Sequence, residues 1–370
     1  MDVVVAPDKF KGSLTAREVA AHIAAGLRSV LPGLAVREVP VADGGDGTLD
    51  AVVAGGFRLV QVRASGPTGE PVDTGYALRD GVAVVELADV SGLGRLPGGV
   101  LEPVRASSYG TGEVVRAALD AGARTVVLGL GGSACTDGGT GMLRALGARL
   151  LDGGGAEVSA WASVERLDLA GLHPRVRSAE IVVASDVDNP LLGDHGAAAV
   201  YGPQKGASPA QVRLLDTALA RWAAVVRRET GVDAADLPGA GAAGGVGFAA
   251  LALGATLRPG IAYLLDVLGF GKHLTEARLV VTGEGSLDEQ TLRGKAPAGV
   301  GAAARAAGVP VVAVAGRIQL ARADLAAAGF AGAYALTDLE PDPARCMAEA
   351  GPLLERLAAQ RVAAHLEVSP

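Results

Sequence analysis

Apolar runs rich in β-branched residues alternate along the chain with alanine-rich stretches of helical period. These runs predict buried strands at residues 3–6, 36–41, 82–87, 125–130, 181–184, 279–282 and 309–315. Continuous apolar strands that alternate with helices are typical of a mainly parallel sheet covered on both faces. The pattern therefore predicts the α/β class.

Two of the predicted helices carry clear signals at both ends. Thr15 and Glu18 can form a capping box, and the helix that follows should end at Pro32. A second capping box at residues 208–211 begins a helix that should run to about residue 230. Both helices show an apolar face of three-to-four-residue spacing, as a surface helix on a sheet requires.

Sheet character changes near residue 59. Three short apolar segments between residues 59 and 87 are joined by the turn signals at 66–69 and 80–81, which indicates antiparallel pairing. The βαβ pattern returns near residue 276. We therefore expect a discontinuous domain of residues 1–58 and 276–370 with a mainly parallel sheet, and an inserted domain of residues 59–275 with a mixed sheet.

Polar and glycine-rich segments follow five of the predicted strands, at the strand ends where open α/β sheets bind ligands. Each Asp-Gly turn taken alone is more often structural than catalytic. Together, however, the segments gather eight carboxylates, whose repulsion Mg²⁺ and a few lysines would relieve. The carboxylates are Asp8, Asp43, Asp46, Asp137, Asp186, Asp188, Glu284 and Asp288. Magnesium, glycine-rich anion cradles and lysines are the parts that phosphoryl transfer requires.

Composition narrows the function classes. The net charge of −7 and the lack of a basic cluster argue against a nucleic-acid partner. The five histidines show no metal-ligand spacing, so zinc is not indicated. No signal peptide or membrane-length apolar run is visible, so we expect a cytoplasmic protein. Arginine supplies 28 of the 33 basic residues, and four of the five lysines lie in glycine-containing segments, which favours anion binding there.

Two other functions compete with a kinase. Residues 129–134 fit the dinucleotide pattern G-x-G-x-x-A after a strand, which would indicate an NAD(P)-dependent oxidoreductase. The glycines at residues 138–141 would break the helix that such a site needs. A binding module without turnover would not need so many clustered carboxylates.

Six segments in series resemble the bacterial type-I glycerate kinases over nearly the whole chain. They are APDKFKGSL (6–14), VADGGDGT (41–48), GGSACTDGG (131–139), SDVDNPL (185–191), YGPQKG (201–206) and TGEGSLD (282–288). The resemblance implies two α/β domains around a cleft and ATP-dependent phosphorylation of D-glycerate, in most members at the 2-hydroxyl. A glycerate 3-kinase and a kinase for another small hydroxy acid stay open as alternatives. We expect ATP and Mg²⁺ as cofactors, and a monomer or homodimer.

Candidate roles follow from this hypothesis. The base that accepts the hydroxyl proton is Asp188 or Asp43, because both follow strands and are flanked by turn residues. Asp186 and Glu284 are candidates for Mg²⁺, and Lys11 and Lys205 for stabilising the transferred charge. The candidate substrate- and phosphate-binding residues are Asp8, Lys9, Ser13, Gly44, Gly45, Asp46, Ser108, Thr111, Gly131, Gly132, Ser133, Asp137, Gly138, Gly139, Asn189, Gly283, Ser286 and Lys295.

Overall fold

The computed structural model describes residues 2–292 and 294–367 and separates the chain into two compact units. The first unit comprises Met1–Asp43, Asp50–Gly56 and Ile261–Pro370, and the second comprises Gly44–Leu49 and Phe57–Gly260. Met1, Arg293 and residues 368–370, which fall in the predicted discontinuous domain, lie outside the described residues. Each unit is built on its own sheet, so the α/β class is confirmed.

Residues 261–275 belong to the first unit, whereas the sequence pattern placed them in the inserted domain. The reason is helix packing. A Cβ on Gly299 of α12 (Ala296–Ala306) would lie 2.5 Å from the side chain of Ile261 in α9 (Gly260–Leu268). Likewise, a Cβ on Gly55, which follows α2 (Thr48–Ala54), would lie 2.3 Å from Leu268. Such contacts between distant segments leave no mark in the local pattern.

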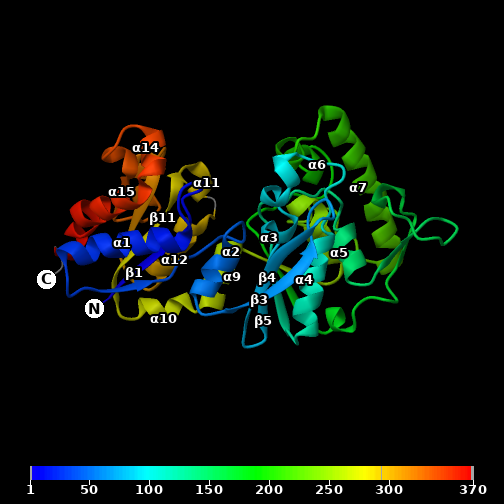
Figure 1. Ribbon diagram of the computed structural model, residues 1–370, viewed down its shortest axis with the longest axis horizontal. Helices are drawn as coiled ribbons and strands as arrows, with labels where there is room; N and C mark the ends of the chain where they lie inside the picture. Colours follow the sequence, from blue (N-terminus) through cyan, green and yellow to red (C-terminus); the bar gives the residue numbers. More distant parts are fainter. Residues whose placement is uncertain (1, 293, 368–370) are drawn as a thin grey trace. The chain divides into compact units, whose positions relative to one another are not determined.

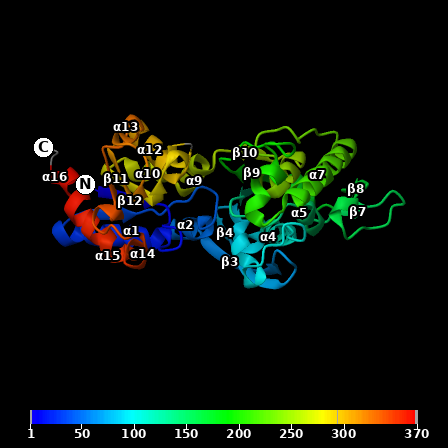
Figure 2. The ribbon, with the colours of Figure 1, turned by 90° about the horizontal axis from the view of Figure 1, so that it is seen from above.

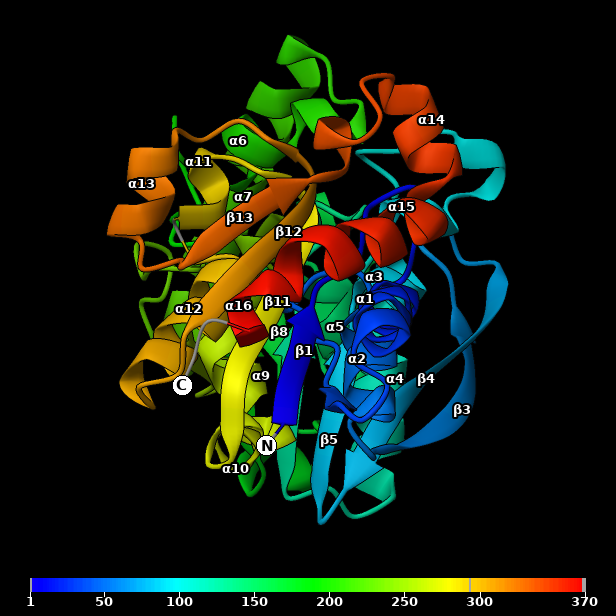
Figure 3. The same cartoon turned by 90° about the vertical axis from the view of Figure 1, so that its left-hand side faces the viewer.

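The first unit contains a five-stranded sheet in which every pairing is parallel, in the order β13-β12-β11-β1-β2. Figure 3 shows β13, β12, β11 and β1 side by side with α15 (Ala350–Leu357) in front of them, and α1 (Ala16–Val30) packs against β1 and β2. Val3 and Val5 join the core under these helices, while α12 contacts β1, β11 and β12. The strands are β1 (Asp2–Pro7), β2 (Ala35–Glu38), β11 (Ala277–Leu287), β12 (Val311–Ile318) and β13 (Gly332–Ala335).

The second unit contains a six-stranded mixed sheet in the order β10-β9-β6-β5-β4-β3, seen on the right of Figure 1 with α4 (Tyr109–Asp120) against it. Strand β4 is antiparallel to both its neighbours and the other pairings are parallel, which confirms the predicted mixed sheet. The strands are β3 (Arg58–Ser65), β4 (Pro71–Arg79), β5 (Val82–Glu86), β6 (Thr125–Gly129), β9 (Glu180–Ala184) and β10 (Thr256–Arg258).

Both helices with predicted end signals form as expected. Helix α1 has the full capping box of Thr15 and Glu18, and α7 (Pro209–Thr230) ends at Gly231 in the left-handed conformation. A small antiparallel pair, β7 (Arg149–Leu151) and β8 (Arg166–Asp168), packs beside α7 (Figure 2). The remaining α-helices are α3 (Ala88–Ser91), α5 (Thr140–Ala145), α6 (Ala197–Tyr201), α8 (Val246–Ala252), α10 (Phe270–Leu274), α11 (Glu289–Leu292), α13 (Arg322–Ala327), α14 (Pro343–Ala348) and α16 (Ala364–Glu367).

Strand β11 corrects one prediction. The sequence pattern ended this strand at residue 282 and placed Gly283, Glu284 and Ser286 in a loop, but all three lie inside the strand and pair with β12. Glycine permits this pairing, because a Cβ on Gly283 would lie 2.1 Å from the backbone oxygen of Val314. Strand β2 ends at Glu38, before the predicted residue 41, although the N–H groups of Val39 and Val41 still donate to the oxygens of Val5 and Pro7.

Within the part of the chain that the structure describes, no helix has both the length and the apolar character that a membrane span needs.

Gly26 tests the packing of α1 against α15. A Cβ at this position would lie 2.2 Å from the backbone oxygen of Glu355, so we expect Gly26→Ala to lower the free energy of unfolding by about 1–3 kcal/mol. Helix propensity alone predicts the opposite sign. Gly33→Ala is the control, because nothing lies within 4 Å of the added Cβ. Urea unfolding measures both, and a Gly26→Ala variant as stable as the wild type would contradict this packing.

Candidate functional site

The carboxylates of Asp8, Asp43 and Glu284 lie near one another at the carboxyl end of β1 in the first unit. Pro7 pairs with Gly283 of β11, and the N–H of Val41 donates to the oxygen of Pro7, so the residues that follow each strand converge. Burial, and then the negative charge of Asp43, raise the pKa of Asp8 to about 8, although the N–H of Lys9 donates to its carboxylate at 2.7 Å. Asp8 therefore carries its proton at neutral pH.

Glu284 forms a cluster of charged side chains with Lys295 and Asp288, close to Asp8. It is 8% exposed, and its pKa is raised mainly by burial. The hydroxyl of Thr291 donates to one carboxylate oxygen at 2.5 Å, and the ammonium of Lys295 lies 3.6 Å from the other. The same ammonium lies 3.8 Å from Asp288. Thr291, which the sequence reasoning missed, thus fixes the Glu284 carboxylate, and only its nearness to the Glu-x-Ser-x-Asp segment could have indicated this.

The other predicted residues of the first unit are less buried. Lys11 is exposed and Lys9 is half-buried. The hydroxyl of Ser13 donates to the backbone oxygen of Met347, and that of Ser286 accepts from the guanidinium of Arg317. Both serines therefore stabilise neighbouring segments of their own unit.

Asp137 is the centre of the glycine-rich segment in the second unit. Its side chain is 2% exposed and accepts hydrogen bonds from the N–H and hydroxyl of Ser108, at 2.8 and 2.9 Å. The hydroxyl of Ser107 and the N–H groups of Gly139 and Gly141 donate to it as well. Ser108 precedes α4, and Gly139 and Gly141 lie at the start of α5. Asp137 therefore holds the starts of these two helices together.

Most of the glycines expected to cradle phosphate use their N–H groups inside the unit. Gly131 donates to the oxygen of Gly44, Gly138 to that of Gly244, and Gly139 to Asp137. These three N–H groups already donate within the unit, whereas we expected them to donate to a phosphate. The N–H groups of Gly132 and Ser133 have no hydrogen-bond partner within residues 2–292 and 294–367.

Lys205 is buried against residues 133–135 of the glycine-rich segment and is not at the protein surface. Its side chain is 1% exposed, and its ammonium donates to the hydroxyl of Ser133 at 2.9 Å and to the backbone oxygen of Cys135 at 2.5 Å. Burial lowers the pKa of this ammonium. We expected Lys205 to contact the transferred phosphoryl group directly. In the structure its ammonium is instead buried against Ser133 and Cys135.

Residues 44–49 form a second glycine-rich segment, and Glu86 at the end of β5 holds it. Its carboxylate accepts from the N–H groups of Gly47 and Leu49 at 3.0 and 2.7 Å. Glu86 is 4% exposed, and burial raises its pKa to about 7. The sequence reasoning missed Glu86, although a carboxylate at the end of a buried strand is a detectable signal.

Gly44 and Gly45 pack closely in that segment, and Asp46 is exposed. A Cβ on Gly44 would lie 2.5 Å from the oxygen of Ala184, and a Cβ on Gly131 would lie 2.5 Å from the Cα of Gly45. Backbone contact thus requires glycine at positions 44 and 131.

Asp186 and Asp188 follow β9 and are exposed. Asp186 accepts from the N–H of Gly260 at 2.9 Å. Asn189 fixes the turn after them, because it donates to the oxygen of His195 and accepts from the hydroxyl of Tyr201. Thr111, by contrast, is fully buried and donates to Ser91, which gives it a structural contact.

No group of three or more His, Cys, Asp or Glu side chains among the described residues could hold a metal ion by itself. Mg²⁺ in phosphoryl-transfer sites is bound by one or two carboxylates together with substrate phosphates, so a complete protein cage is not required. An ionised carboxylate offers about four lone-pair sites, so Glu284, which accepts from Thr291, could also bind such an ion.

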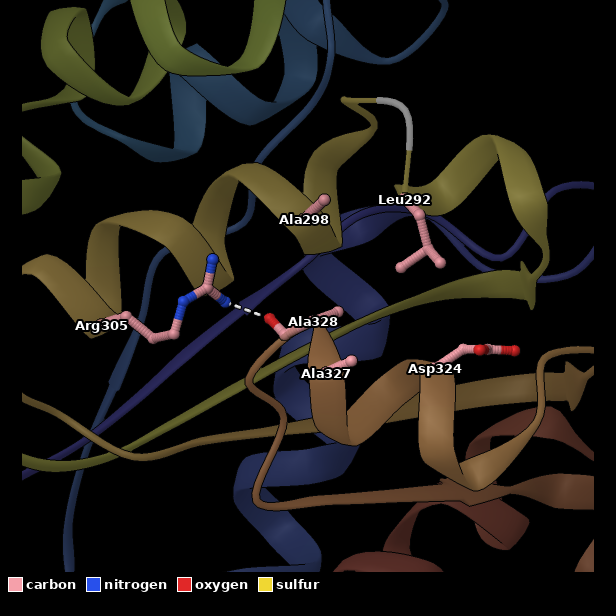
Figure 4. A pocket seen from close by; sticks show the side chains of 6 residues that line it. All are labelled: Leu292, Ala298, Arg305, Asp324, Ala327 and Ala328. Carbon is pink, nitrogen blue, oxygen red and sulfur yellow. Dashed lines mark hydrogen bonds between the residues drawn. The ribbon is translucent and has the colours of Figure 1, made fainter.

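A surface pocket of about 410 Å³ lies elsewhere in the first unit, between α12 and α13. Figure 4 shows its alanine methyl groups, with Arg305 bound to the oxygen of Ala328 and with Asp324 at the other side. None of the predicted site residues lines it, so we do not assign the phosphoryl chemistry to this pocket.

Comparisons with known proteins agree over nearly the full length of the chain. The model of the family described as "Glycerate kinase family" matches residues 3–367. The chain is 44% identical to a protein named glycerate kinase from Bacillus subtilis, over 86% of each chain, and 43% identical to one named glycerate 2-kinase from Escherichia coli, again over 86% of each. A crystal structure from Salmonella typhimurium LT2, with the provisional description glycerate kinase 2, superposes with a TM-score of 0.86 at 41% identity, covering 99% of this chain and 98% of that one.

Asp137→Asn tests the buried carboxylate. An asparagine keeps one acceptor oxygen and places an NH₂ group against N–H donors, so we expect the free energy of unfolding to fall by about 1–3 kcal/mol or more. Asp152→Asn is the control, because this carboxylate is more exposed and accepts a single backbone N–H in the described structure. Equal stability of the Asp137→Asn variant and the wild type in urea would contradict the assigned hydrogen bonds.

Glu86 makes stability depend on pH. The folded-state pKa of about 7 lies above the ordinary glutamate value of 4.5, so the unfolded state releases the proton first as pH rises. The wild type should therefore lose up to about 3 kcal/mol, relative to Glu86→Gln, between pH 4.5 and 7, with no further loss above that range. Asp8 titrates in both proteins and cancels in this comparison. A difference in unfolding free energy that stays constant from pH 4.5 to 8 would contradict the assignment.

Proposed function

Because the chain belongs to the glycerate kinase family, we propose that it transfers the γ-phosphoryl group of ATP to the 2-hydroxyl of D-glycerate. The observation that carries this proposal is the family match over residues 3–367, with high identity to an Escherichia coli protein named glycerate 2-kinase. The carboxyl ends of β1, β9 and β11 carry the acidic residues that such a reaction uses. Cytoplasmic location and assembly as a monomer or homodimer stay predictions.

In this reaction, a bond forms between the glycerate 2-oxygen and the γ-phosphorus while the bond from that phosphorus to the β,γ-bridging oxygen breaks. ADP and 2-phosphoglycerate are the products, and the hydroxyl proton passes to a carboxylate. Asp188 and Asp43 stay the two candidates for this carboxylate. Asp188 is exposed beside the turn that Asn189 fixes, and Asp43 is half-buried next to Asp8.

Mg²⁺ fits this proposal as a phosphate-bound ion held by Asp186 or Glu284. When bound, it would neutralise charge that develops on the phosphate oxygens. Glu284 is oriented for such a role by Thr291, and Lys295 reduces the repulsion between Glu284 and Asp288. Lys11, which is exposed, can reach a phosphate without a burial cost.

The proposal predicts ATP-dependent turnover of D-glycerate and a loss of kcat when the proton acceptor is removed. We expect either Asp188→Asn or Asp43→Asn to lower kcat by about 10²- to 10⁴-fold, because the amide cannot accept the hydroxyl proton. A coupled ADP-release assay on a panel of small hydroxy acids, with NMR of the product, measures the substrate and the phosphorylated position.

Asp236→Asn is the matched control, since Asp236 is exposed and lies outside the candidate site. If both Asp188→Asn and Asp43→Asn kept wild-type kcat, neither carboxylate would be the base. If the wild type phosphorylated none of the hydroxy acids, the kinase proposal would fall, and a 3-phosphate product would contradict the position of transfer.

A further inference from the structure

Lys205 is a buried basic side chain, and the negative charge of Asp137 acts on it without a direct ion pair. Its side chain is 1% exposed, and no carboxylate forms an ion pair with it among the residues that the structure describes. Both of its hydrogen bonds go to neutral oxygens, of Ser133 and Cys135. Burying an ammonium in this way costs several kcal/mol, so its retention calls for a compensating interaction.

The hydrogen bond from Lys205 determines what Ser133 can do. An ammonium only donates, so the Ser133 oxygen must accept, and its own proton is then available for another acceptor. No acceptor for this hydroxyl proton is found within residues 2–292 and 294–367. While the Lys205 side chain donates to its oxygen, the Ser133 hydroxyl is thus oriented as a donor to a further acceptor.

Further donors lie next to this hydroxyl. The N–H groups of Gly132 and Ser133 also lack partners among the described residues, and Gly131 and Gly132 are exposed. Gly132 can present its N–H in this way because its φ of +74° suits glycine. The hydroxyl of Thr136, 1% exposed and in the same segment, is one of two buried side-chain atoms in the described chain without a hydrogen-bond partner.

We propose that Lys205 is a positioning residue, which holds the Ser133 hydroxyl as a donor to a phosphoryl oxygen that also accepts from the N–H groups of Gly132 and Ser133. The proposal rests on the proposed phosphoryl transfer and gives Lys205 an indirect role, through Ser133, in place of direct contact with the ligand. The ligand class is a phosphorylated one, either the nucleotide or phosphoglycerate, since both present the same oxygens.

Binding measurements test this without turnover. Titration calorimetry with ATP, ADP and 2-phosphoglycerate, each alone, should show a 10- to 100-fold weaker affinity for at least one ligand in Ser133→Ala, because a donor to a charged group is lost. Loss for ATP and ADP assigns the site to the nucleotide, and loss for 2-phosphoglycerate assigns it to the product. Ser133→Thr keeps the hydroxyl and should bind nearly as the wild type does.

A double-mutant cycle tells whether Lys205 acts by positioning the Ser133 hydroxyl or only by stabilising the segment around it. Lys205→Met should weaken the same ligand as Ser133→Ala does, and the double variant should be no weaker than the weaker single variant. Losses that add in the double variant would contradict positioning through Ser133. Lys272→Met is the matched control, because Lys272 is an exposed lysine outside the site.

Should Lys205→Met not fold, the NMR signal of the Lys205 ammonium gives a second measurement. It should shift when the ligand binds to the wild type and stay unchanged in Ser133→Ala. An affinity of Ser133→Ala within twofold of the wild type for all three ligands overturns the proposal. Absence of glycerate phosphorylation by the wild type would instead remove the proposed function, and these binding data would still report on the site.

Discussion

The buried carboxylate of Asp137 is the interaction on which the glycine-rich segment of the second unit depends. A buried charge is tolerated only when donors surround it, and here Ser108 and the N–H groups of Gly139 and Gly141 provide them. These donors begin α4 and α5, so one carboxylate fixes the relative position of two helices that pack together. This carboxylate therefore supports residues 131–136, in which the N–H groups of Gly132 and Ser133 have no partner among the described residues.

The first unit balances its buried carboxylates in a different way. At the end of β1, Asp8 keeps a proton because burial and Asp43 both oppose its ionisation. At Glu284, a hydroxyl and the ammonium of Lys295 share the charge. The carboxylates of the first unit are thus relieved by a proton and by a cation, whereas Asp137 in the second unit is relieved by a shell of N–H and hydroxyl donors.

The elements that follow local rules could be predicted from the sequence, as the capping box of Thr15 and the alternation of apolar strands show. The extent of β11 could not, because Gly283 looks like a loop residue until β12 lies against it. The position of Lys205 was missed for a related reason. Its neighbouring glycines indicated a loop and an anion, but burial depends on residues about 70 positions away. Local patterns therefore predicted the segments that carry the candidate residues, but not the direction of their side chains.

The glycines of residues 129–141 serve two purposes that composition alone cannot separate. Gly131 and Gly138 are required by close packing, since a Cβ would lie 2.5 Å from the Cα of Gly45 and 2.6 Å from the ring of Trp222, respectively. Gly132 is required by its positive φ, and its N–H has no partner among the described residues. In a chain that uses arginine for most positive charge, the residue buried beside Ser133 is a lysine, whose ammonium is compact and donates without the planar fork of a guanidinium. The closely packed glycines fix the backbone of this segment. In our proposal, Lys205 orients the Ser133 hydroxyl toward a bound anion.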